Sequence, residues 1–419
     1  MANRSGEQIP LKIDALVYGG SGLARLPDGR AVFIPYVLPR EEIVVQITEQ
    51  QEHFARGQLL ELLTQSPERT QPRCRHFTQC GGCHYQHIHY KNQLKFKNEI
   101  FIEQLQRIGG FIQPNISAPV PSPQEWHYRN TMQFHLTNEG KLGLMLTNSN
   151  DVFPLQECHL PIECIDALWP KIEFDVSTDV NRIEVRQGAE DDVMVVLFSD
   201  KEVIPECEID APVSVVHKTD IGSVVIAGED YVYMKVGERR FRLTAGSFFQ
   251  VNNFITEKCI QLLLEKISPQ KSAVVLDLYC GVGLFSAFLA PLVKNVIAIE
   301  SAQEAVDDFI ENLDDFDNVS LYHGLVENIL PNVDKKVDIV ILDPPRAGLH
   351  RKALDALLQT SPTCIAYFSC DPATLARDAK RLCRSGFILE ESMILDMFPQ
   401  TYHIESLNIF RKSEPKTLN

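Results

Sequence analysis

The second half of the chain alternates short apolar runs with segments of helical periodicity, and this pattern constrains the fold more than any other feature. From residue 244 onward, apolar runs at 273–279, 295–300, 337–343 and 364–369 are each followed by a segment that can form a helix. Buried parallel strands joined by crossover helices predict a doubly wound, Rossmann-like α/β sheet. In such sheets ligands bind at the carboxyl ends of the strands.

The first half of the chain has a different rhythm. Residues 9–64 alternate β-rich runs with Gly and Pro turns, which predicts a small antiparallel barrel. The polar segment 64–73 contains two prolines and is interpreted as a linker, and residues 89–108 have helical periodicity among strand-like runs. We therefore expect three domains: a barrel at 1–68, a central α+β domain at 69–243 and an α/β domain at 244–419.

Composition places the chain among globular proteins. Hydrophobic residues make up 44% of the 419 residues and charged residues 23%. The chain lacks a basic-then-apolar leader and a stretch of about 18 uncharged apolar residues, so we expect a cytoplasmic protein with no membrane association. The eleven cysteines then indicate thiol chemistry, metal ligation or core packing rather than disulfides. No obligate protein partner is expected.

The net charge of −16 is unfavourable for nucleic-acid binding as a whole, but its distribution is uneven. Residues 73–135 contain seven Lys or Arg against three acidic residues, together with six of the twelve histidines. This stretch is the one region where a polyanion would be locally favoured. A solvated basic face without a partner is the alternative.

The segment "DLYCGVGLFS" (277–286) follows an apolar strand and opens a helix. Its glycines, Gly281 and Gly283, allow a sharp turn close to a ligand, and Glu300 ends the next strand, where a carboxylate can accept hydrogen bonds from ribose hydroxyls. The third glycine of the dinucleotide fingerprint and the Gly-Lys-Ser/Thr of a phosphate loop are absent. The motif therefore favours adenosine with little or no phosphate, and S-adenosylmethionine fits.

Two further motifs occupy the same expected sheet edge. Asp343 ends a strand in "LDPPRAGL", and Cys370 lies between the strand "CIAYFS" and a helix that Pro372 begins. A helix N-terminus should lower the pKa of the Cys370 thiol and favour the thiolate. Beside a methyl donor, a thiolate could add to carbon 6 of uracil and so make carbon 5 nucleophilic.

Methylation by this route also needs a base that removes the proton from carbon 5. The segment "FPQTYHIE" offers His403 and Glu405, and strand alternation would place both on one face. Either residue could serve, and a plain surface hairpin is the structural alternative.

The segment "CRHFTQCGGCHYQ" has metal-ligand spacing. Cys74, Cys80 and Cys83 are close in sequence around two glycines, which suits an iron–sulfur cluster or zinc with one more ligand supplied from elsewhere. Cys158 and Cys164 are both candidates for the fourth ligand, and spacing does not choose between them.

Taken together, these motifs resemble the RNA 5-methyluridine methyltransferases over nearly the whole chain. "SFFQVN", "DLYCGVGLFS", "LDPPRAGL", "SCDPATLARD" and "FPQTYHIE" occur in the family's order. The resemblance implies Cys370 as the nucleophile and Glu405 as the base. It also implies four residues that bind S-adenosylmethionine, namely Gln250, Tyr279, Glu300 and Asp343.

The remaining features resemble the ribosomal RNA branch of the family. The N-terminal barrel resembles an RNA-binding TRAM domain of the OB-like type, and the cysteine cluster resembles that branch's 4Fe-4S site. The resemblance implies the four cysteines Cys74, Cys80, Cys83 and Cys158 as ligands and 23S ribosomal RNA as the substrate. The same chemistry on transfer RNA is the alternative, followed by an amino-group nucleic-acid methyltransferase and by an iron–sulfur RNA-binding module with an inactive methyltransferase domain.

Overall fold

The computed structural model describes residues 6–174, 179–333 and 336–413. It divides into two compact units that are each assembled from separate parts of the chain. Unit 1 comprises residues 1–103, 144–151 and 398–403, and unit 2 comprises 104–143, 152–397 and 404–419. The expected division into domains at 1–68, 69–243 and 244–419 stays a prediction, since these units follow contacts rather than sequence boundaries.

Unit 1 contains a small six-stranded sheet whose strand order is β1-β5-β6-β4-β3-β2. Alternating residues of its strands point into a core that includes Val32, Ile34, Val45 and Ile47. The pairs are antiparallel except β4 with β6, which is parallel and departs from the purely antiparallel expectation. The strands are β1 (Gln8–Lys12), β2 (Ala15–Leu16), β3 (Ser21–Arg25), β4 (Ala31–Pro35), β5 (Glu42–Gln50) and β6 (Phe54–Thr64).

The segment after β6 is attached to this sheet instead of being a free linker. Glu41 is fully buried, and its carboxylate accepts hydrogen bonds from the Arg69 guanidinium at 2.6 and 2.7 Å. Arg69 also donates to the Tyr36 carbonyl at 2.9 Å. A buried carboxylate that lost this bidentate partner would be strongly destabilising, so Arg69 fixes where the chain leaves the sheet.

Helix α1 (Tyr90–Gln104) continues into a short π-helical turn at Leu105–Gly109, close to the helix expected from periodicity. Within unit 1, the buried Gln93 donates to Gln400 Oε1 at 2.9 Å, and Gln93 Oε1 accepts from the Gln400 amide at 2.9 Å. These reciprocal bonds hold the segment 398–403 beside the helix, although about 300 residues separate them in sequence.

Unit 2 contains a seven-stranded, mostly antiparallel sheet of order β15-β14-β12-β11-β7-β8-β9, as the strand-rich sequence predicted. A separate hairpin joins β16 (Tyr231–Val236) with β17 (Arg239–Thr244). A second short pair joins β10 (Ile172–Phe174) with β13 (Cys207–Ile209), and α2 spans Glu163–Leu168. The strands of the large sheet are β7 (Thr131–Leu136), β8 (Leu142–Met145), β9 (Val152–Pro154), β11 (Val180–Gln187), β12 (Val193–Ser199), β14 (Ser214–Thr219) and β15 (Gly222–Ala227).

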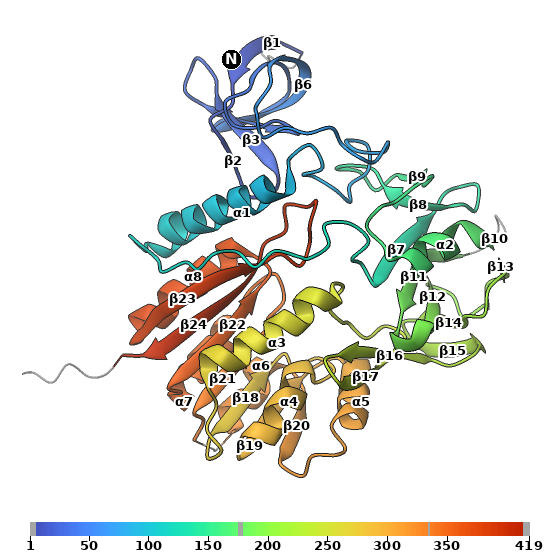
Figure 1. The fold of residues 1–419 in the computed structure, drawn as a ribbon, viewed down its shortest axis with the longest axis vertical. Coiled ribbons are helices and arrows are strands. Elements are labelled where there is room, and N and C mark those ends of the chain that lie inside the picture. Colours follow the sequence, from blue (N-terminus) through green and yellow to red (C-terminus); the bar gives the residue numbers. More distant parts are fainter. Residues whose placement is uncertain (1–5, 175–178, 334–335, 414–419) are drawn as a thin grey trace, which may run out of the picture. The chain divides into compact units, whose positions relative to one another are not determined.

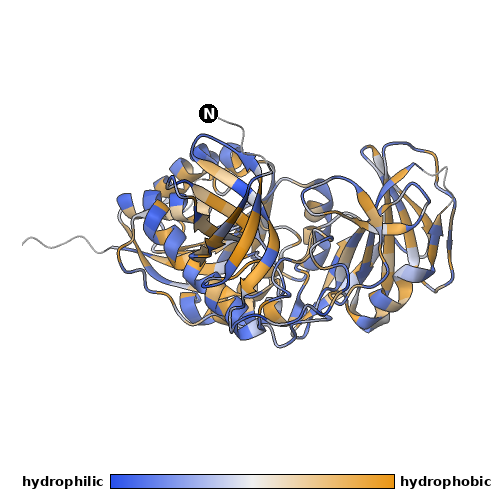
Figure 2. Ribbon diagram, turned by 90° about the horizontal axis from the view of Figure 1, so that it is seen from above, coloured by the Kyte–Doolittle hydropathy of each residue, from blue (hydrophilic) through white to orange (hydrophobic). Residues whose placement is uncertain are grey.

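The last part of unit 2 is the expected doubly wound sheet, with order β20-β19-β18-β21-β22-β24-β23 (Figure 1). Its first five strands are parallel, β24 runs antiparallel to β22, and β23 runs antiparallel to β24. The strands are mostly apolar and the helices carry polar outer sides (Figure 2), as expected for a sheet buried on both faces. The strands are β18 (Val274–Leu278), β19 (Asn295–Glu300), β20 (Val319–His323), β21 (Ile339–Leu342), β22 (Cys364–Ser369), β23 (Phe387–Leu395) and β24 (Glu405–Lys412), and the helices are α3 (Asn253–Ile267), α4 (Leu284–Leu289), α5 (Gln303–Asn312), α6 (Val326–Ile329), α7 (Arg351–Thr360) and α8 (Pro372–Arg384).

Candidate active site

Four of the predicted site residues lie at one edge of the doubly wound sheet. Tyr279 follows β18, Glu300 ends β19, Asp343 follows β21 and Cys370 follows β22. The four strands are neighbours in the sheet and parallel, so their carboxyl ends meet at the same edge. This is the placement that the sequence motifs predicted.

The loop after β18 is shaped by its glycines and by Glu300. Gly281 and Gly283 have φ angles of 54° and 91°, in the left-handed region that favours glycine. A Cβ on Gly283 would lie 2.3 Å from Leu313 Cδ1, so this position also needs the absence of a side chain. Glu300 Oε2 accepts the Gly281 N–H at 2.9 Å, while Oε1 accepts the N–H of Ser301 at 2.7 Å. Oε1 also accepts the Ala302 N–H at 2.8 Å, so Oε2 is the oxygen that keeps a lone-pair direction for a ribose hydroxyl.

Asp277, within β18, is a buried carboxyl close to Asp343 and Glu300 that the sequence analysis did not single out. Its side chain is fully buried, and Oδ2 accepts a hydrogen bond from the Ser286 hydroxyl at 2.7 Å. Among the described residues, Oδ1 has no hydrogen-bond partner. Burial raises the pKa of the Asp277 carboxyl to about 7, and the nearby Asp343 carboxylate adds to this. A single charged residue inside the apolar run "VVLDLY" was the available signal.

A pocket of about 370 Å³, partly open to solvent, lies beside this edge. Gln250, Asp343 and Glu405 are the predicted residues that line it. One wall is formed by Phe285 and Phe368, whose rings stack with centroids 4.5 Å apart. The other lining residues are Thr256, Cys259, Leu284, Leu395, Met397 and Ser406.

The segment that carries Gln250 is held by side chains from distant parts of unit 2. The buried Asn130 donates to the Gln250 carbonyl at 2.9 Å, and its backbone N–H donates to the Val251 carbonyl at 3.0 Å. Asn252 caps α3 by accepting the Ile255 N–H. Asn130 gave no sequence signal, because a tertiary contact 120 residues away defines its role.

Cys370 and Glu405 approach each other through the pairing of β22 with β24. Ser369 is the register partner of Ser406, so Cys370 and Glu405 are the next residues on either strand. Burial, followed by the carboxylates of Glu405 and Asp343, raises the pKa of the Cys370 thiol to about 12, while Arg346 acts in the opposite direction. Burial also raises the pKa of the Asp343 carboxyl to about 6.

The prediction that the start of α8 lowers the thiol's pKa is therefore wrong. The N-terminal amides of α8 are already occupied, since Asp371 Oδ1 accepts the N–H groups of Ala373 and Thr374 at 2.9 and 2.8 Å. Pro372, the first residue of the helix, has no N–H to offer. Desolvation and two neighbouring carboxylates consequently outweigh the helix dipole at this thiol.

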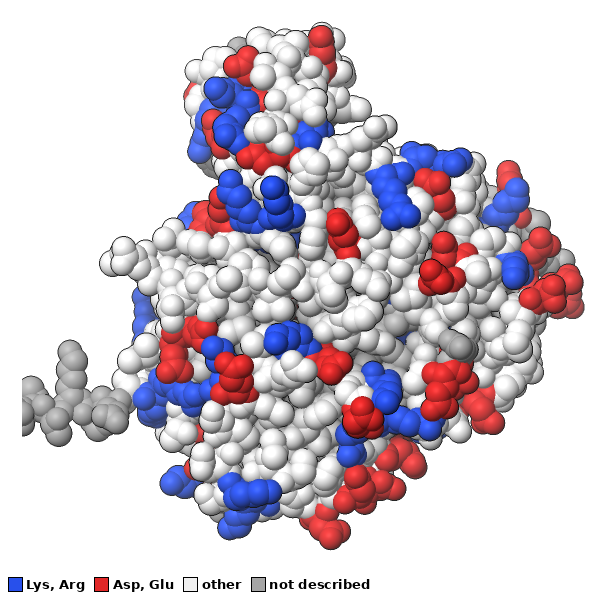
Figure 3. Space-filling view, viewed as in Figure 1, with Lys and Arg blue, Asp and Glu red and all other residues white. Residues whose placement is uncertain are grey.

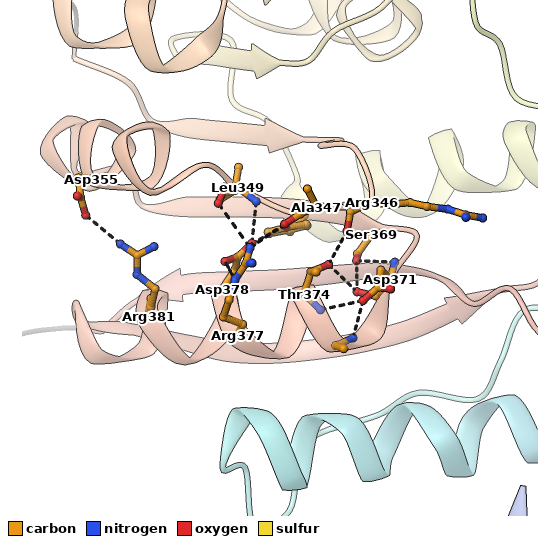
Figure 4. A network of polar contacts seen from close by, with 12 residues as sticks. Arg346, Ala347, Leu349, Asp355, Ser369, Asp371, Thr374, Arg377, Asp378 and Arg381 are labelled. Atoms are coloured by element: carbon orange, nitrogen blue, oxygen red, sulfur yellow. Dashed lines mark hydrogen bonds and ion pairs between the residues drawn. The ribbon is translucent and has the colours of Figure 1, made fainter. Parts of the chain in front are cut away.

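The loop "DPPRAGL" is tied to α8 by a polar network (Figure 4). Asp378 is fully buried and accepts the Leu349 N–H at 2.8 Å and the Tyr367 hydroxyl at 3.1 Å. Thr374 Oγ1 donates to the Arg346 carbonyl at 3.1 Å, and the Arg346 side chain leads away from the network (Figure 4). The network fixes the strand ends that carry Asp343 and Cys370 against each other.

His403 does not share a strand with Glu405. Strand β24 begins at Glu405, and His403 precedes it in the segment assigned to unit 1. Its ring packs against Tyr402, with centroids 4.5 Å apart. The expectation that strand alternation puts both side chains on one face is therefore wrong, and Glu405 is the candidate that lines the pocket.

The four cysteines that were predicted to hold an iron–sulfur cluster belong to two different units. Cys74, Cys80 and Cys83 belong to unit 1 and Cys158 to unit 2, and none of the four is in a disulfide. Cys80 and Cys83 are buried; burial raises the pKa of the Tyr36 hydroxyl, and these two cysteines add a smaller contribution. In the part of the chain that the structure describes, no group of three or more His, Cys, Asp or Glu side chains is arranged to hold a metal ion. Thiols suit a cluster chemically, but the fourfold grouping is not confirmed.

Comparison with known proteins identifies the family. Residues 209–413 match the model of the tRNA (uracil-5-)-methyltransferase family, and residues 3–60 match the TRAM domain. An uncharacterised RNA methyltransferase of Streptomyces coelicolor is 32% identical, with 96% of this chain and 93% of the relative covered. The 23S rRNA (uracil(1939)-C(5))-methyltransferase RlmD of Shewanella sediminis is 31% identical, with 96% of each chain covered. This chain belongs to the RNA uracil-5-methyltransferase family.

A solved relative supports the fold of this family member. The Pyrococcus abyssi tRNA (uracil-54, C5)-methyltransferase, solved in complex with S-adenosyl-L-homocysteine, superposes with a TM-score of 0.73. It is 24% identical and covers 96% of this chain and 99% of its own. The N-terminal TRAM domain and the C-terminal methyltransferase fold agree with the sequence prediction. Among the described residues, no helix has the length and apolar character needed to cross a membrane.

Proposed function

We propose that the protein methylates carbon 5 of a uridine in 23S ribosomal RNA, with S-adenosylmethionine as the methyl donor. The observation that carries this proposal is the meeting of a thiol and two carboxylates, Cys370, Glu405 and Asp343, beside one pocket. The 31% identity to a 23S rRNA methyltransferase over 96% of the chain supports the substrate.

The residues at the sheet edge suit an adenosyl ligand. Glu300 presents a carboxylate that its own loop already orients, and Tyr279 lies at the adjacent strand end. Gln250 and Asp343 line the neighbouring pocket, where they would bind the methyl donor. S-adenosylmethionine, when bound, supplies an electrophilic methyl group on a sulfonium centre. Polar groups that are already in position bind a ligand without the free-energy cost of rearranging first.

Cys370 acts as the nucleophile in this proposal. Its sulfur bonds to carbon 6 of the uracil ring, and the electron pair of the carbon 5–carbon 6 double bond moves onto carbon 5. Because the thiol is protonated in the free protein, its proton must pass to a base as the bond forms. Carbon 5 then takes the methyl group while that group's bond to the sulfonium sulfur breaks, which leaves a neutral thioether. Glu405 removes the carbon 5 proton, the double bond returns and the bond between carbon 6 and the Cys370 sulfur breaks.

The test combines the mapping of modified nucleosides in RNA with two variants of the protein. Loss of 5-methyluridine at one 23S rRNA position in cells without this gene, measured by nucleoside mass mapping, is the expected result. Purified Cys370→Ala should lose turnover while keeping its fold, whereas Glu405→Gln should accumulate a covalent RNA adduct visible on a denaturing gel. Cys383→Ala, on the helix α8 that follows Cys370, is the matched control and should retain turnover. Turnover by Cys370→Ala would refute the proposal that the Cys370 thiol is the nucleophile.

Transfer RNA is the second candidate substrate. The solved relative with the TM-score of 0.73 over 96% of this chain is a tRNA methyltransferase. Purified protein offered a 23S rRNA fragment and a tRNA T-loop in equal amounts separates the two substrates. Methylation of the T-loop alone would keep the chemistry and change the substrate.

We also propose that Cys74, Cys80, Cys83 and Cys158 ligate an iron–sulfur cluster. The spacing of the first three cysteines and the burial of Cys80, Cys83 and Cys158 support this assignment. Anaerobically purified protein should contain about four iron and four sulfide per chain, and Cys83→Ser should lower both. Cys207→Ser, remote in sequence, is the control. Wild-type protein without iron or sulfide would refute the cluster.

A further inference from the structure

Strand β15 leaves one edge of the seven-stranded sheet open. In the described part of the chain, β14 is the only strand that pairs with it. All six residues from Gly222 to Ala227 are exposed, and the exposed fractions of Val224, Val225 and Ile226 are 48%, 46% and 39%. Ile221, in the preceding turn, is 75% exposed. Neither face of this strand is therefore buried against the rest of the protein.

The sequence of β15 lacks most devices that protect a sheet edge. Residues 221–228, "IGSVVIAG", contain no charge and no proline. The register with β14 shifts between Val225 and Ala227, but Gly222–Val225 pair regularly. Edge strands normally carry a Lys, a Pro or a covering segment, because their free N–H and C=O groups invite another strand. A regular, uncharged, β-branched edge is thus suited to strand addition.

The charges around β15 select the partner. Residues 200–230 contain eight acidic residues and two lysines. Both lysines are already paired, Lys201 with Asp179 and Lys218 with Glu304. Figure 3 shows acidic side chains gathered over the surface formed by β10, β13, β14 and β15, on the right of the view. This excess of negative charge disfavours the binding of a nucleic-acid strand at the edge.

The ends of the strand also disfavour a second copy of the chain. Asp220 and Glu229 flank β15 at its two ends, and both are exposed. An antiparallel pair of β15 strands would bring Asp220 of one copy toward Glu229 of the other, and a parallel pair would bring identical acids together. Either arrangement juxtaposes like charges. A strand with basic residues at its ends would instead meet an acidic group on each side.

We propose that β15 is a docking edge for an extended, basic segment of another protein, which pairs with it as an eighth strand. Backbone hydrogen bonds supply the affinity, Val224 and Val225 supply apolar contacts, and the flanking acids Asp220 and Glu229 select basic ends. The site is independent of the proposed methylation chemistry and goes beyond it.

The test uses the full-length protein and a synthetic peptide with five alternating Thr and Val residues between two pairs of lysines. Fluorescence anisotropy should show saturable binding, at least tenfold tighter than for the peptide with glutamates in place of the lysines. Val224→Lys should weaken binding at least tenfold, and Val225→Lys is a second variant of the same kind. Val203→Lys adds the same charge at a loop valine that is 72% exposed, and should change binding less than twofold.

Amide hydrogen exchange should show protection confined to residues 222–227 and their β14 partners when the lysine peptide binds. The proposal would be overturned by no binding of the lysine peptide, by equal binding of the glutamate peptide, or by binding that Val224→Lys leaves unchanged. A dimer in light scattering that Val224→Lys dissociates would assign the edge to a second copy instead. Protection of β15 by RNA alone would likewise overturn it.

Discussion

The Cys370 thiol of the free protein should react slowly with alkylating reagents at neutral pH. Burial and the carboxylates of Glu405 and Asp343 raise its pKa from 9.0 to about 12. The thiolate is the reactive form, so the alkylation rate should follow the thiolate fraction. The nucleophile is therefore held in its protonated form until a substrate or methyl donor changes its surroundings.

The size of the effect follows from the pKa. At pH 8 a thiol of pKa 9 is about one-tenth ionised and one of pKa 12 about one ten-thousandth, a thousandfold difference. Because Cys370 is only half-buried, solvent screening reduces this to about 100-fold. Removing the charge of one neighbouring carboxylate should recover up to about tenfold, which corresponds to one pKa unit.

The assay is iodoacetamide labelling of the folded protein from pH 7 to 10, followed by mass spectrometry of the peptide that contains Cys370. The labelling rate should rise about tenfold per pH unit without a plateau and stay about 100-fold below that of free glutathione at pH 8. Glu405→Gln should accelerate it, whereas Glu390→Gln, an exposed carboxylate on β23, should not. A plateau near pH 8 in the wild-type protein would refute the reasoning.

Substitutions of three other residues around the site test its stability and its binding of the cofactor. Asp277→Asn should raise the free energy of unfolding at pH 8 by up to about 4 kcal/mol, since the carboxyl pKa rises from 3.8 to about 7 on folding. Because folding raises the carboxyl pKa, the wild-type protein loses stability as the pH rises from about 4 to 7. In thermal melts the gain in stability from Asp277→Asn should therefore be smaller at pH 5 than at pH 8. A larger gain at pH 5 would contradict this. Gly348→Ala should cost about 1–3 kcal/mol in denaturant unfolding, because Gly348 has φ 71° and a Cβ would lie 2.6 Å from Asp378 Oδ2. Asn130→Ala should weaken S-adenosylmethionine binding about tenfold in calorimetry by freeing the Gln250 segment, and unchanged affinity would exclude Asn130 from positioning it.

The sequence predicted the elements whose signals are local. Periodicity and turn residues gave the doubly wound sheet and the helix near α1, and strand ends gave the positions of Tyr279, Glu300, Asp343 and Cys370. Parallel strands deliver their carboxyl ends to one edge whatever the loops contain, which is why these residues could be grouped without coordinates.

Interactions between distant segments were not predictable in the same way. Asp371 caps α8 by accepting N–H groups at its start, and burial together with Glu405, which the pairing of β22 with β24 brings close, reverses the expected pKa shift of Cys370. Asp378 looks like an ordinary helix residue until Leu349 and Tyr367 are placed against it. A short sequence motif does not show which groups will compete for hydrogen bonds with a carboxylate or an amide.

The amino-acid sequence by itself determined the family, the order of the domains' motifs and the residue types available for chemistry, because these depend on side-chain identity and spacing. Only the tertiary structure decided the protonation of Cys370, the place of Glu405 in the lining of the pocket, and the exposure of β15. Each of these depends on desolvation and on charges brought together from separate parts of the chain, and both are properties of packing in three dimensions.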